Sequence, residues 1–370
     1  DITPNEYPTM LYPKLIDTTL PITGKLDYTK YNGTSLAWAY AYTTEDVAID
    51  PVDSLHQGQI TNDYNKLYET DFIDIVDVWI YKDTDVSKLS VNKNITKAYI
   101  ELTSSNYTTR LEEVLQYYPK CKDLYLFDDG TPTAISYLCN YSPLAKAQIE
   151  NITFLDGYFE NLTSVENSFI SMVKLVSVSN IPDSVYNMQS AFVGSSKFTT
   201  LDKFPSSLTY LAGAFQNCYE LKTIPELPKG VQRLSNTFQN CNNFNQQLDL
   251  SETNIQPDKL TSAFNGCTSL THTPILPTNF KGSMANCFQG CTKLTQAPEI
   301  PSGVTNMTGC FKGCTALTTP TTIPEGVTTV NDCFSNCTSL ATAPAIPDKV
   351  DNMNFAFNNC SALTVAPTIG

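Results

Sequence analysis

The chain has 370 residues, of which 41% are hydrophobic and 16% charged, and its formal net charge is −14. This composition is too apolar for intrinsic disorder, and the length predicts two domains, or a repeat array with an additional piece. The negative charge argues against nucleic acid or an anionic membrane surface as the main partner, because both require clustered Lys and Arg. No apolar run approaches the roughly 18 residues that a membrane-spanning helix needs, so no membrane insertion is expected.

The composition changes near residue 160. The first 160 residues hold 24 acidic and 12 basic side chains, and the remainder hold 13 and 11. The first part carries 17 of the 20 Tyr, whereas ten of the 12 Cys follow it. Such a shift indicates different architectures, or different faces of one architecture.

Residues 1–70 follow no period, and we expect an N-terminal cap or a small docking domain there, since exposed solenoid ends need a cap. A strand-like stretch lies within this segment at 36–42. Residues 71–165 are predicted to hold degenerate repeats with looser spacing. Their strand-like segments are Ile73–Tyr81, Ala98–Leu102, Leu124–Phe127 and Ile152–Leu155.

Residues 166–370 form a regular internal repeat anchored on the motif Phe-x-(Asn/Gly)-Cys. From Phe169 onward the spacings between successive anchor phenylalanines are 23, 23, 23, 26, 24, 23, 23 and 23 residues. A constant period of this length is typical of a solenoid. The clear copies are Phe215–Cys218, Phe238–Cys241, Phe264–Cys267, Phe288–Cys291, Phe311–Cys314, Phe334–Cys337 and Phe357–Cys360.

One repeat cannot bury its own apolar face, but a stack of repeats can. We therefore expect Leu294, Ile300, Val304, Met307 and Phe311, and their equivalents, to point inward. The residue before each anchor Cys is Asn or Gly, which tolerates a left-handed backbone, so a short helix or 3₁₀ turn is expected to end there. The predicted fold is an α/β-type repeat solenoid of about 23-residue units, built mostly of short strands and loops with short helical turns.

The unit Cys-x-x-Leu, Pro-x-Ile-Pro, Val-x-x-Met and Phe-x-x-Cys resembles the BspA-like, Treponema-type leucine-rich repeat of surface proteins. One copy runs from Cys291 through Pro298–Pro301 and Val304 to Cys314. The resemblance covers 165–370. It implies adhesion or recognition rather than chemistry, and a place on the cell surface or outside the cell.

The twelve cysteines allow three interpretations. They form a buried ladder of free thiols that act as small hydrophobic side chains, or successive turns are joined by disulfides. A metal site is the third, and the absence of Cys-x-x-Cys and the presence of only two His argue against it. The disulfide hypothesis pairs Cys267 with Cys287, Cys291 with Cys310, and Cys314 with Cys333.

No catalytic, phosphate-binding or dinucleotide-binding motif occurs in the chain, so we predict no enzyme activity, no cofactor and no metal. Both His56 and His272 are interpreted as surface residues. The favoured hypothesis is a binding or adhesion protein whose partner is a protein or glycan on a host or neighbouring cell. Candidate ligand contacts are the variable residues after each Cys-x-x-Leu, although such rows also serve simply to solvate a β surface. They are Lys222, Thr223, Thr271, His272, Thr295, Gln296, Thr318 and Thr319.

The alternative hypothesis is a structural subunit of a phage fibre, virion decoration or extracellular filament. In that case the N-terminal segment would dock the protein and the solenoid would project from it. Self-assembly end to end is then expected, because a heterologous interface permits open assemblies.

Overall fold

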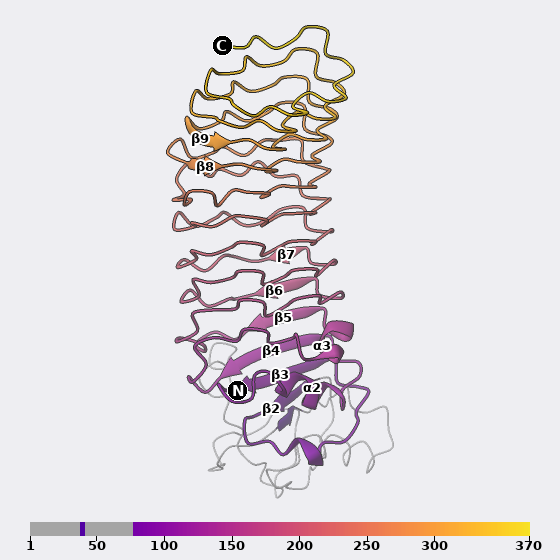
Figure 1. Cartoon of the computed structure of the whole chain (residues 1–370). Helices are drawn as coiled ribbons and strands as arrows, with labels where there is room; N and C mark the ends of the chain where they lie inside the picture. Colours follow the sequence, from indigo (N-terminus) through magenta and orange to yellow (C-terminus); the bar gives the residue numbers. More distant parts are fainter. Residues whose placement is uncertain (1–37, 41–76) are drawn as a thin grey trace, which may run out of the picture. The chain divides into compact units, whose positions relative to one another are not determined.

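A computed structural model describes residues 38–40 and 77–370 and divides the chain into two compact units. The first unit holds the residues up to Leu162 together with Val178–Pro182, and the second holds Thr163–Ser177 and Asp183–Gly370. The cap or docking domain expected over 1–70 lies outside the described residues, apart from strand β1 (Trp38–Tyr40). Figure 1 labels the elements of both units.

The first unit is built on a parallel sheet whose strands follow one another in chain order. Strand β1 pairs antiparallel with β2, and β2 to β5 pair parallel. Each strand confirms a strand-like segment expected from the sequence, within a few residues. The elements are β2 (Asp77–Ile80), η3 (Val86–Lys88), β3 (Lys97–Leu102), α2 (Arg110–Leu115), β4 (Asp123–Asp128), α3 (Pro143–Gln148) and β5 (Asn151–Phe154).

The core of the first unit lies on one face of this sheet. Ala98, Ile100 and Leu102 alternate along β3 and are fully buried, because successive side chains of a strand point to opposite faces. The opposite face carries a second, aromatic cluster around Trp79 and Tyr81. The Trp79 ring stacks on Tyr99 with centroids 3.9 Å apart. These aromatic residues therefore pack against the sheet, together with Phe127 and Tyr158.

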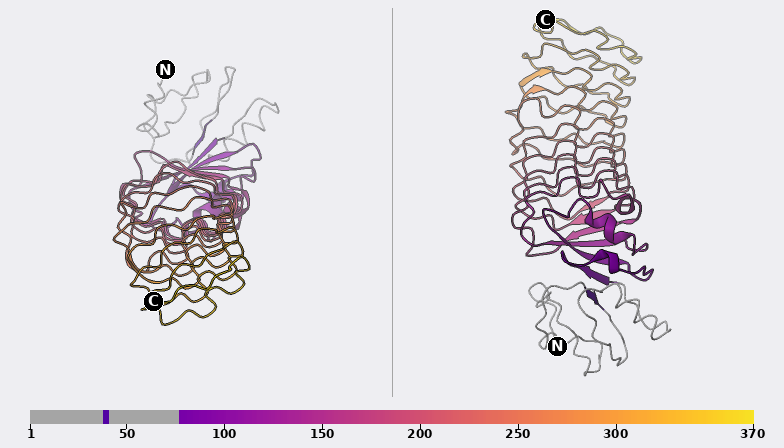
Figure 2. Two further views of the ribbon diagram at one scale, coloured as in Figure 1. Left: turned by 90° about the horizontal axis from the view of Figure 1, so that it is seen from above. Right: turned by 60° about the horizontal axis from the view of Figure 1, so that its bottom comes forward.

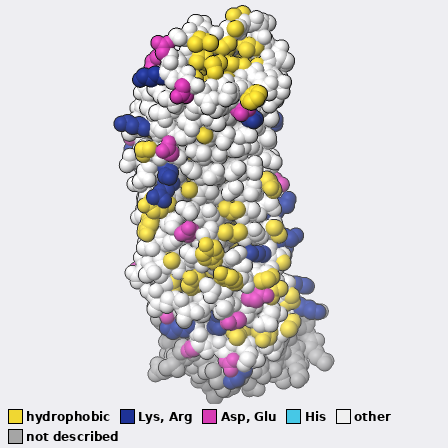
Figure 3. All heavy atoms as spheres, in the orientation of Figure 1, with side chains coloured by type: hydrophobic (Ala, Val, Ile, Leu, Met, Phe, Trp, Pro, Cys, Tyr) yellow, Lys and Arg dark blue, Asp and Glu magenta, His cyan; other side chains and the backbone are white. Residues whose placement is uncertain are grey.

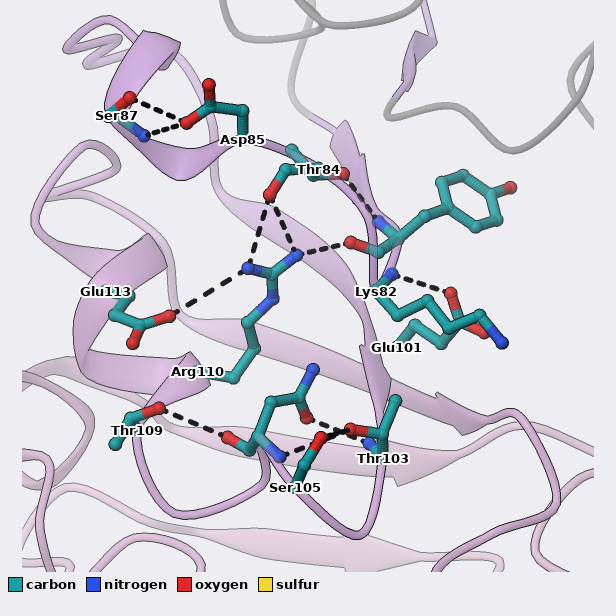
Figure 4. A network of polar contacts seen from close by, with 12 residues as sticks. Lys82, Thr84, Asp85, Ser87, Glu101, Thr103, Ser105, Thr109, Arg110 and Glu113 are labelled. Atoms are coloured by element: carbon teal, nitrogen blue, oxygen red, sulfur yellow. Dashed lines mark hydrogen bonds and ion pairs between the residues drawn. The ribbon is translucent and has the colours of Figure 1, made fainter.

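A buried arginine holds the turn that follows β2 (Figure 4). The Arg110 side chain is 4% exposed and donates hydrogen bonds to the backbone carbonyls of Tyr81 and Thr84. Its carboxylate neighbour Glu113 is exposed and 3.9 Å away, and burial lowers the pKa of Arg110. A buried guanidinium needs such acceptors, because an unpaired buried charge is strongly destabilising. This arginine therefore has a structural role.

The second unit is a stack of turns of nearly constant length (Figure 2). Regular strands are short: β7 (Thr200–Leu201), β8 (Lys281–Ser283) and β9 (Gly303–Asn306), with β6 (Ser177–Ser179) at the boundary between the units. Strands β8 and β9 pair parallel. Elsewhere single parallel bridges join equivalent residues of successive turns, such as Asn306 with Thr329 and Thr329 with Asn352. The repeat array expected from the sequence is confirmed.

Of the two forms expected for the segment before each anchor Cys, a short helix or a 3₁₀ turn, the structure has i→i+3 turns and no helix. Alternate amides point along the stack: Phe215 N–H donates to the Thr237 carbonyl, and Asn217 N–H donates to that of Gln239. The amides between them, such as that of Gln216, close i→i+3 turns. A helix would use every amide internally, so it is incompatible with this ladder between turns.

Left-handed backbone occurs at two positions of this segment, four residues apart. The expected position directly before the anchor Cys is confirmed, with φ of +62° at Asn217 and +75° at Gly313. The second position, exemplified by Gly213 and Asn236, was not recognised in the sequence. Asn and Gly adopt this conformation at the lowest cost, which accounts for their abundance in the motif.

The anchor phenylalanines form a continuous column of stacked rings. Phe288 is fully buried, its ring centroid lies 5.5 Å from that of Phe264 and 5.6 Å from that of Phe311, and the ring planes are within 4° of parallel. Offset stacking of this kind adds to the large apolar area that each ring buries. The column is the core of the second unit.

The anchor cysteines form a second buried column beside the rings. The Cys314 thiol donates to the Phe288 carbonyl at 3.1 Å, and the other anchor thiols from Cys218 to Cys360 repeat this bond one turn along. Ser195 takes the Cys position in an earlier turn and makes the same bond to Phe169 at 2.7 Å. All twelve cysteines are free and buried, so the structure has the thiol ladder.

None of the three disulfides considered from the sequence is present in the structure. Cys287, Cys310 and Cys333 stand at a position that is Ala in other turns, and they are fully buried as thiols. Their partners in the hypothesis, Cys267, Cys291 and Cys314, instead donate to phenylalanine carbonyls. The carbonyl of the preceding turn satisfies each anchor thiol without a covalent bond.

Replacing Phe288 with Ala should destabilise the second unit by roughly 3–5 kcal/mol, because it opens a cavity in the middle of the ring column. The measurement is the urea midpoint followed by circular dichroism. Phe355 is the matched control, since its side chain is 70% exposed. Phe355→Ala should change stability by less than about 0.5 kcal/mol. Equal effects of the two substitutions would contradict the ring column as the core.

Stability should fall as the pH rises above about 9. Burial raises the pKa of the Cys287 and Cys337 thiols to about 12, from an ordinary value of 9.0. Between these values the unfolded chain loses thiol protons that the folded chain keeps, so the unfolded state gains relative to the folded one. The urea midpoint should therefore be flat from pH 7 to 8 and decline above pH 9.

The control for this pH profile replaces Cys287, Cys310 and Cys333 with Ala, the residue at the same position in other turns. The decline above pH 9 should become shallower, because the variant lacks three of the thiols whose pKa is raised by burial. All other titratable side chains are the same in both proteins. An identical slope in the variant would contradict a contribution of the buried thiols to the loss of stability above pH 9. Alkylation in urea without reductant should label all twelve thiols. This measurement verifies that the cysteines are free before the pH series begins.

Candidate binding surface

The residues predicted as ligand contacts lie on the surface of the second unit, and all eight are exposed. The structure brings them together in two runs. Thr318 N–H donates to the Thr295 carbonyl at 3.0 Å, and Gln296 forms a bridge with Thr319. In the other run, Asn245 N–H donates to the Lys222 carbonyl at 3.0 Å. We call the eight residues the polar strip.

Several hydrogen-bonding groups of the polar strip are already paired within the protein. The Thr318 hydroxyl donates to the Thr295 carbonyl at 3.2 Å, and the Thr271 hydroxyl donates to the Asn245 side chain at 2.9 Å. His272 Nδ1 lies 3.0 Å from the Thr271 hydroxyl, so His272 is a surface residue as expected, while His56 lies outside the described residues. The groups most available to a ligand are therefore the side chains of Lys222 and Gln296.

A second column, whose bridged residues are buried or half-buried, carries a cluster that was not recognised in the sequence. Parallel bridges align Ser164, Asn187, Tyr210 and Arg233 in successive turns. The Tyr186 and Tyr210 rings meet edge to face with centroids 6.0 Å apart, and the Arg233 guanidinium carbon lies 4.2 Å from the Tyr210 centroid. The Tyr186 side chain is 43% exposed. We call Tyr186, Tyr210 and Arg233 the Tyr–Arg cluster.

Amide side chains surround the Tyr–Arg cluster. Asn187 and Gln189 donate to the Glu166 carboxylate at 3.1 and 3.4 Å, and the Gln256 amide donates to that of Gln232 at 2.8 Å. Ion pairs between the described residues do not include Arg233, whose buried Nε has no hydrogen-bond partner. The cluster therefore combines two rings, one unpaired cation and several amides.

A comparison of repeats could have revealed this cluster. Five residues before each anchor Phe, most turns have a small polar side chain, such as Ser164, Asn306, Thr329 or Asn352. Tyr210, Arg233 and Lys259 depart from this pattern in three successive turns, and Tyr186 lies one residue before Asn187 in the turn that precedes them. Tyr and Arg are also the residue types most enriched at binding hot spots.

A polar hollow of about 270 Å³ opens at the one repeat that is 26 residues long. Its wall includes Gln246, whose amide accepts from the Ile224 N–H at 2.8 Å and donates to the Ile224 carbonyl at 3.1 Å. The side chain thus takes the place of a backbone strand pair in the longer turn. Lys229 and Glu252 at the rim form an exposed ion pair at 3.3 Å, a kind that contributes little to stability.

Within 38–40 and 77–370, no metal-ligand group is found, and the one face drawn in Figure 3 has no basic patch. No group of three His, Cys, Asp or Glu side chains there is arranged to hold a metal ion. The face drawn in Figure 3 is mostly uncharged, and its charged side chains are scattered rather than gathered. A search of the same residues for membrane-spanning segments finds no helix with the necessary length and apolarity.

Several solved structures to which this chain is similar are bacterial leucine-rich repeat proteins. One from Bacteroides ovatus is 20% identical, with 59% of this chain and 58% of that chain covered and a TM-score of 0.43. A leucine-rich cell surface protein from Faecalibacterium prausnitzii is 20% identical, with coverage of 70% and 79% and a TM-score of 0.37. A T. pallidum leucine-rich repeat protein is 21% identical, with coverage of 68% and 86% and a TM-score of 0.33. This chain thus spans less than two thirds of the Bacteroides ovatus protein.

Curated proteins give no match to the sequence. A family model described as the BspA type leucine-rich repeat region matches residues 131–245 and 235–364, with six copies. These ranges cover more than half of the chain and include every anchor Phe-x-(Asn/Gly)-Cys motif named above. The chain therefore belongs to the BspA-type leucine-rich repeat family.

Proposed function

We propose that this protein is an extracellular or surface-displayed binding or adhesion protein that uses its solenoid as a recognition scaffold. The observation that carries the proposal is the alignment of exposed side chains in columns, one residue per turn, on a backbone hydrogen-bonded from turn to turn. Such columns present many contacts at fixed spacing and lose little conformational freedom on binding. The partner is a protein or glycan on a host or neighbouring cell.

The buried thiols are compatible with an oxidising environment. Thiolates, rather than thiols, are the species that oxidise, and burial raises the pKa of every one of the ten cysteines from Cys218 to Cys360. The family relative from Faecalibacterium prausnitzii is described as a cell surface protein. Both points support display outside the cell without disulfides.

The role of a binding scaffold also accounts for the character of the surface. The hollow at the long repeat is lined mostly by polar and charged side chains, and the polar strip consists of hydroxyls, one amide, one imidazole and one lysine. Typical enzyme sites are instead concave and largely apolar, with a few convergent polar groups. We therefore assign the protein a binding role and no catalytic role.

Localisation tests the proposal directly. An antibody raised against the second unit should label intact, unpermeabilised cells of the native source, and brief protease treatment of those cells should remove the label. Permeabilisation is the control, since it should not increase the signal. Label found only after permeabilisation would contradict surface display, and label confined to virions or detached filaments would favour a structural subunit.

Alanine at Gln296 and Lys222 tests the polar strip. If the strip contacts the partner, binding of the purified chain to intact target cells should fall about tenfold, because both side chains offer free polar groups. The matched control replaces Thr292 and Thr315, which are exposed but whose hydroxyls bond to the preceding turn. Unchanged binding of the strip variant would remove the strip as a contact surface.

A further inference from the structure

We propose that the Tyr–Arg cluster binds a sugar that carries a single carboxylate. The inference deepens the proposed binding function and rests on it, since it assigns a ligand class and a site that the polar strip does not contain. Tyr186, Tyr210 and Arg233 come from three successive turns, and the stacking of those turns alone brings them together.

Arg233 is the group that receives the carboxylate. The chain has only two arginines, and the other, Arg110, donates its terminal N–H groups to the carbonyls of Tyr81 and Thr84, although its Nε, like that of Arg233, has no hydrogen-bond partner. The Arg233 side chain makes no hydrogen bond or ion pair to another described residue, and its principal contact is the Tyr210 ring. A guanidinium stacked on a ring keeps its outer N–H groups in one plane, which suits bidentate binding of a carboxylate.

Tyr186 supplies the surface for the sugar ring. Its side chain is 43% exposed, and its edge-to-face contact with Tyr210 fixes the orientation of the ring. Tyrosine has few rotatable bonds, so it presents a large amphipathic area at low entropic cost. The apolar face of a pyranose can pack on this ring, while the phenol oxygen remains available to a hydroxyl.

The surrounding amides suit hydroxyl groups rather than apolar side chains. Asn187, Gln189, Gln232 and Gln256 lie around the rings, and amides both donate and accept hydrogen bonds. The Glu166 carboxylate already accepts bonds from Asn187 and Gln189. A protein hot spot would instead need a well-packed, desolvated apolar pocket, which favours a sugar over an acidic peptide segment.

The charges around the cluster favour a ligand with one negative group. The residues after 160, which contain the cluster, hold 13 acidic and 11 basic side chains, so no excess of cations is present to attract a polyanion. Arg233 is the one cation of the cluster, and a single carboxylate matches it. A terminal acidic sugar therefore fits better than a sulfated or repeatedly charged polysaccharide.

The test uses the full chain and two pairs of probes that differ in the acidic group. The pairs are 3′-sialyllactose with lactose, and methyl β-D-glucuronide with methyl β-D-glucoside, titrated by calorimetry or ligand-observed NMR. At least one acidic probe should bind about tenfold more tightly than its neutral partner, as a charge-assisted bidentate contact implies. Equal binding within both pairs, or no binding by all four, would overturn the proposal.

Three variants locate the contact. Arg233→Gln should abolish the preference for the acidic probe, Arg233→Lys should restore it only in part, and Tyr186→Ala should weaken both acidic and neutral probes. Asn306→Ala, at the same column position in a distant turn, is the matched control and should bind as the wild type does. Thermal melting checks that each variant is folded. Unchanged binding by Arg233→Gln would overturn the assignment.

Two further measurements separate the alternatives. A short acetylated peptide with one Glu among glycines should bind at least about tenfold more weakly than the acidic sugar, and equal binding that depends on Arg233 would replace the sugar with an acidic peptide. If Arg233→Gln still binds intact cells while no acidic sugar binds the wild type, this inference fails and the proposed function stands. If the protein is not displayed on cells, the proposed function fails whatever the probes show.

Discussion

The hydrogen bonds between successive turns are the constraint on which the second unit depends. Alternate amides of each turn donate to the next, as Phe215 does to Thr237 and Asn217 to Gln239. Because every such bond joins a residue to the one just before its counterpart in the next turn, each side chain must lie over that counterpart. The Phe column and the Cys column follow from this register, and so do the exposed columns of the surface.

The same register explains why variation at one repeat position becomes a local patch. An inward position must match its neighbours in size, so Ser195 replaces Cys only because its hydroxyl reaches the same carbonyl. An outward position has no such requirement. Tyr210 and Arg233 can therefore differ from the small polar residues of their column, and the stacking brings them into contact at 4.2 Å.

Part of the candidate surface was predictable. The variable residues after each Cys-x-x-Leu, such as Thr295 and Thr318, were expected to be exposed and neighbouring, and they are. That the Thr318 hydroxyl bonds to the Thr295 carbonyl could not be inferred from spacing, because it depends on the rise between turns. Tyr186 was overlooked, since it lies outside the positions that define the repeat and only the fold places it against Tyr210.

The sequence by itself determined the repeat, its period of about 23 residues, the inward positions and the left-handed residue before each anchor Cys. These features are encoded locally and recur in many copies, so their signal accumulates along the chain. Only the tertiary structure decided that Phe-x-x-Cys is preceded by turns rather than a helix, that each thiol donates to a carbonyl, and that two tyrosines meet an arginine. Those outcomes depend on contacts between residues more than 20 positions apart, whose geometry is set by the stacking of turns and not by any one repeat.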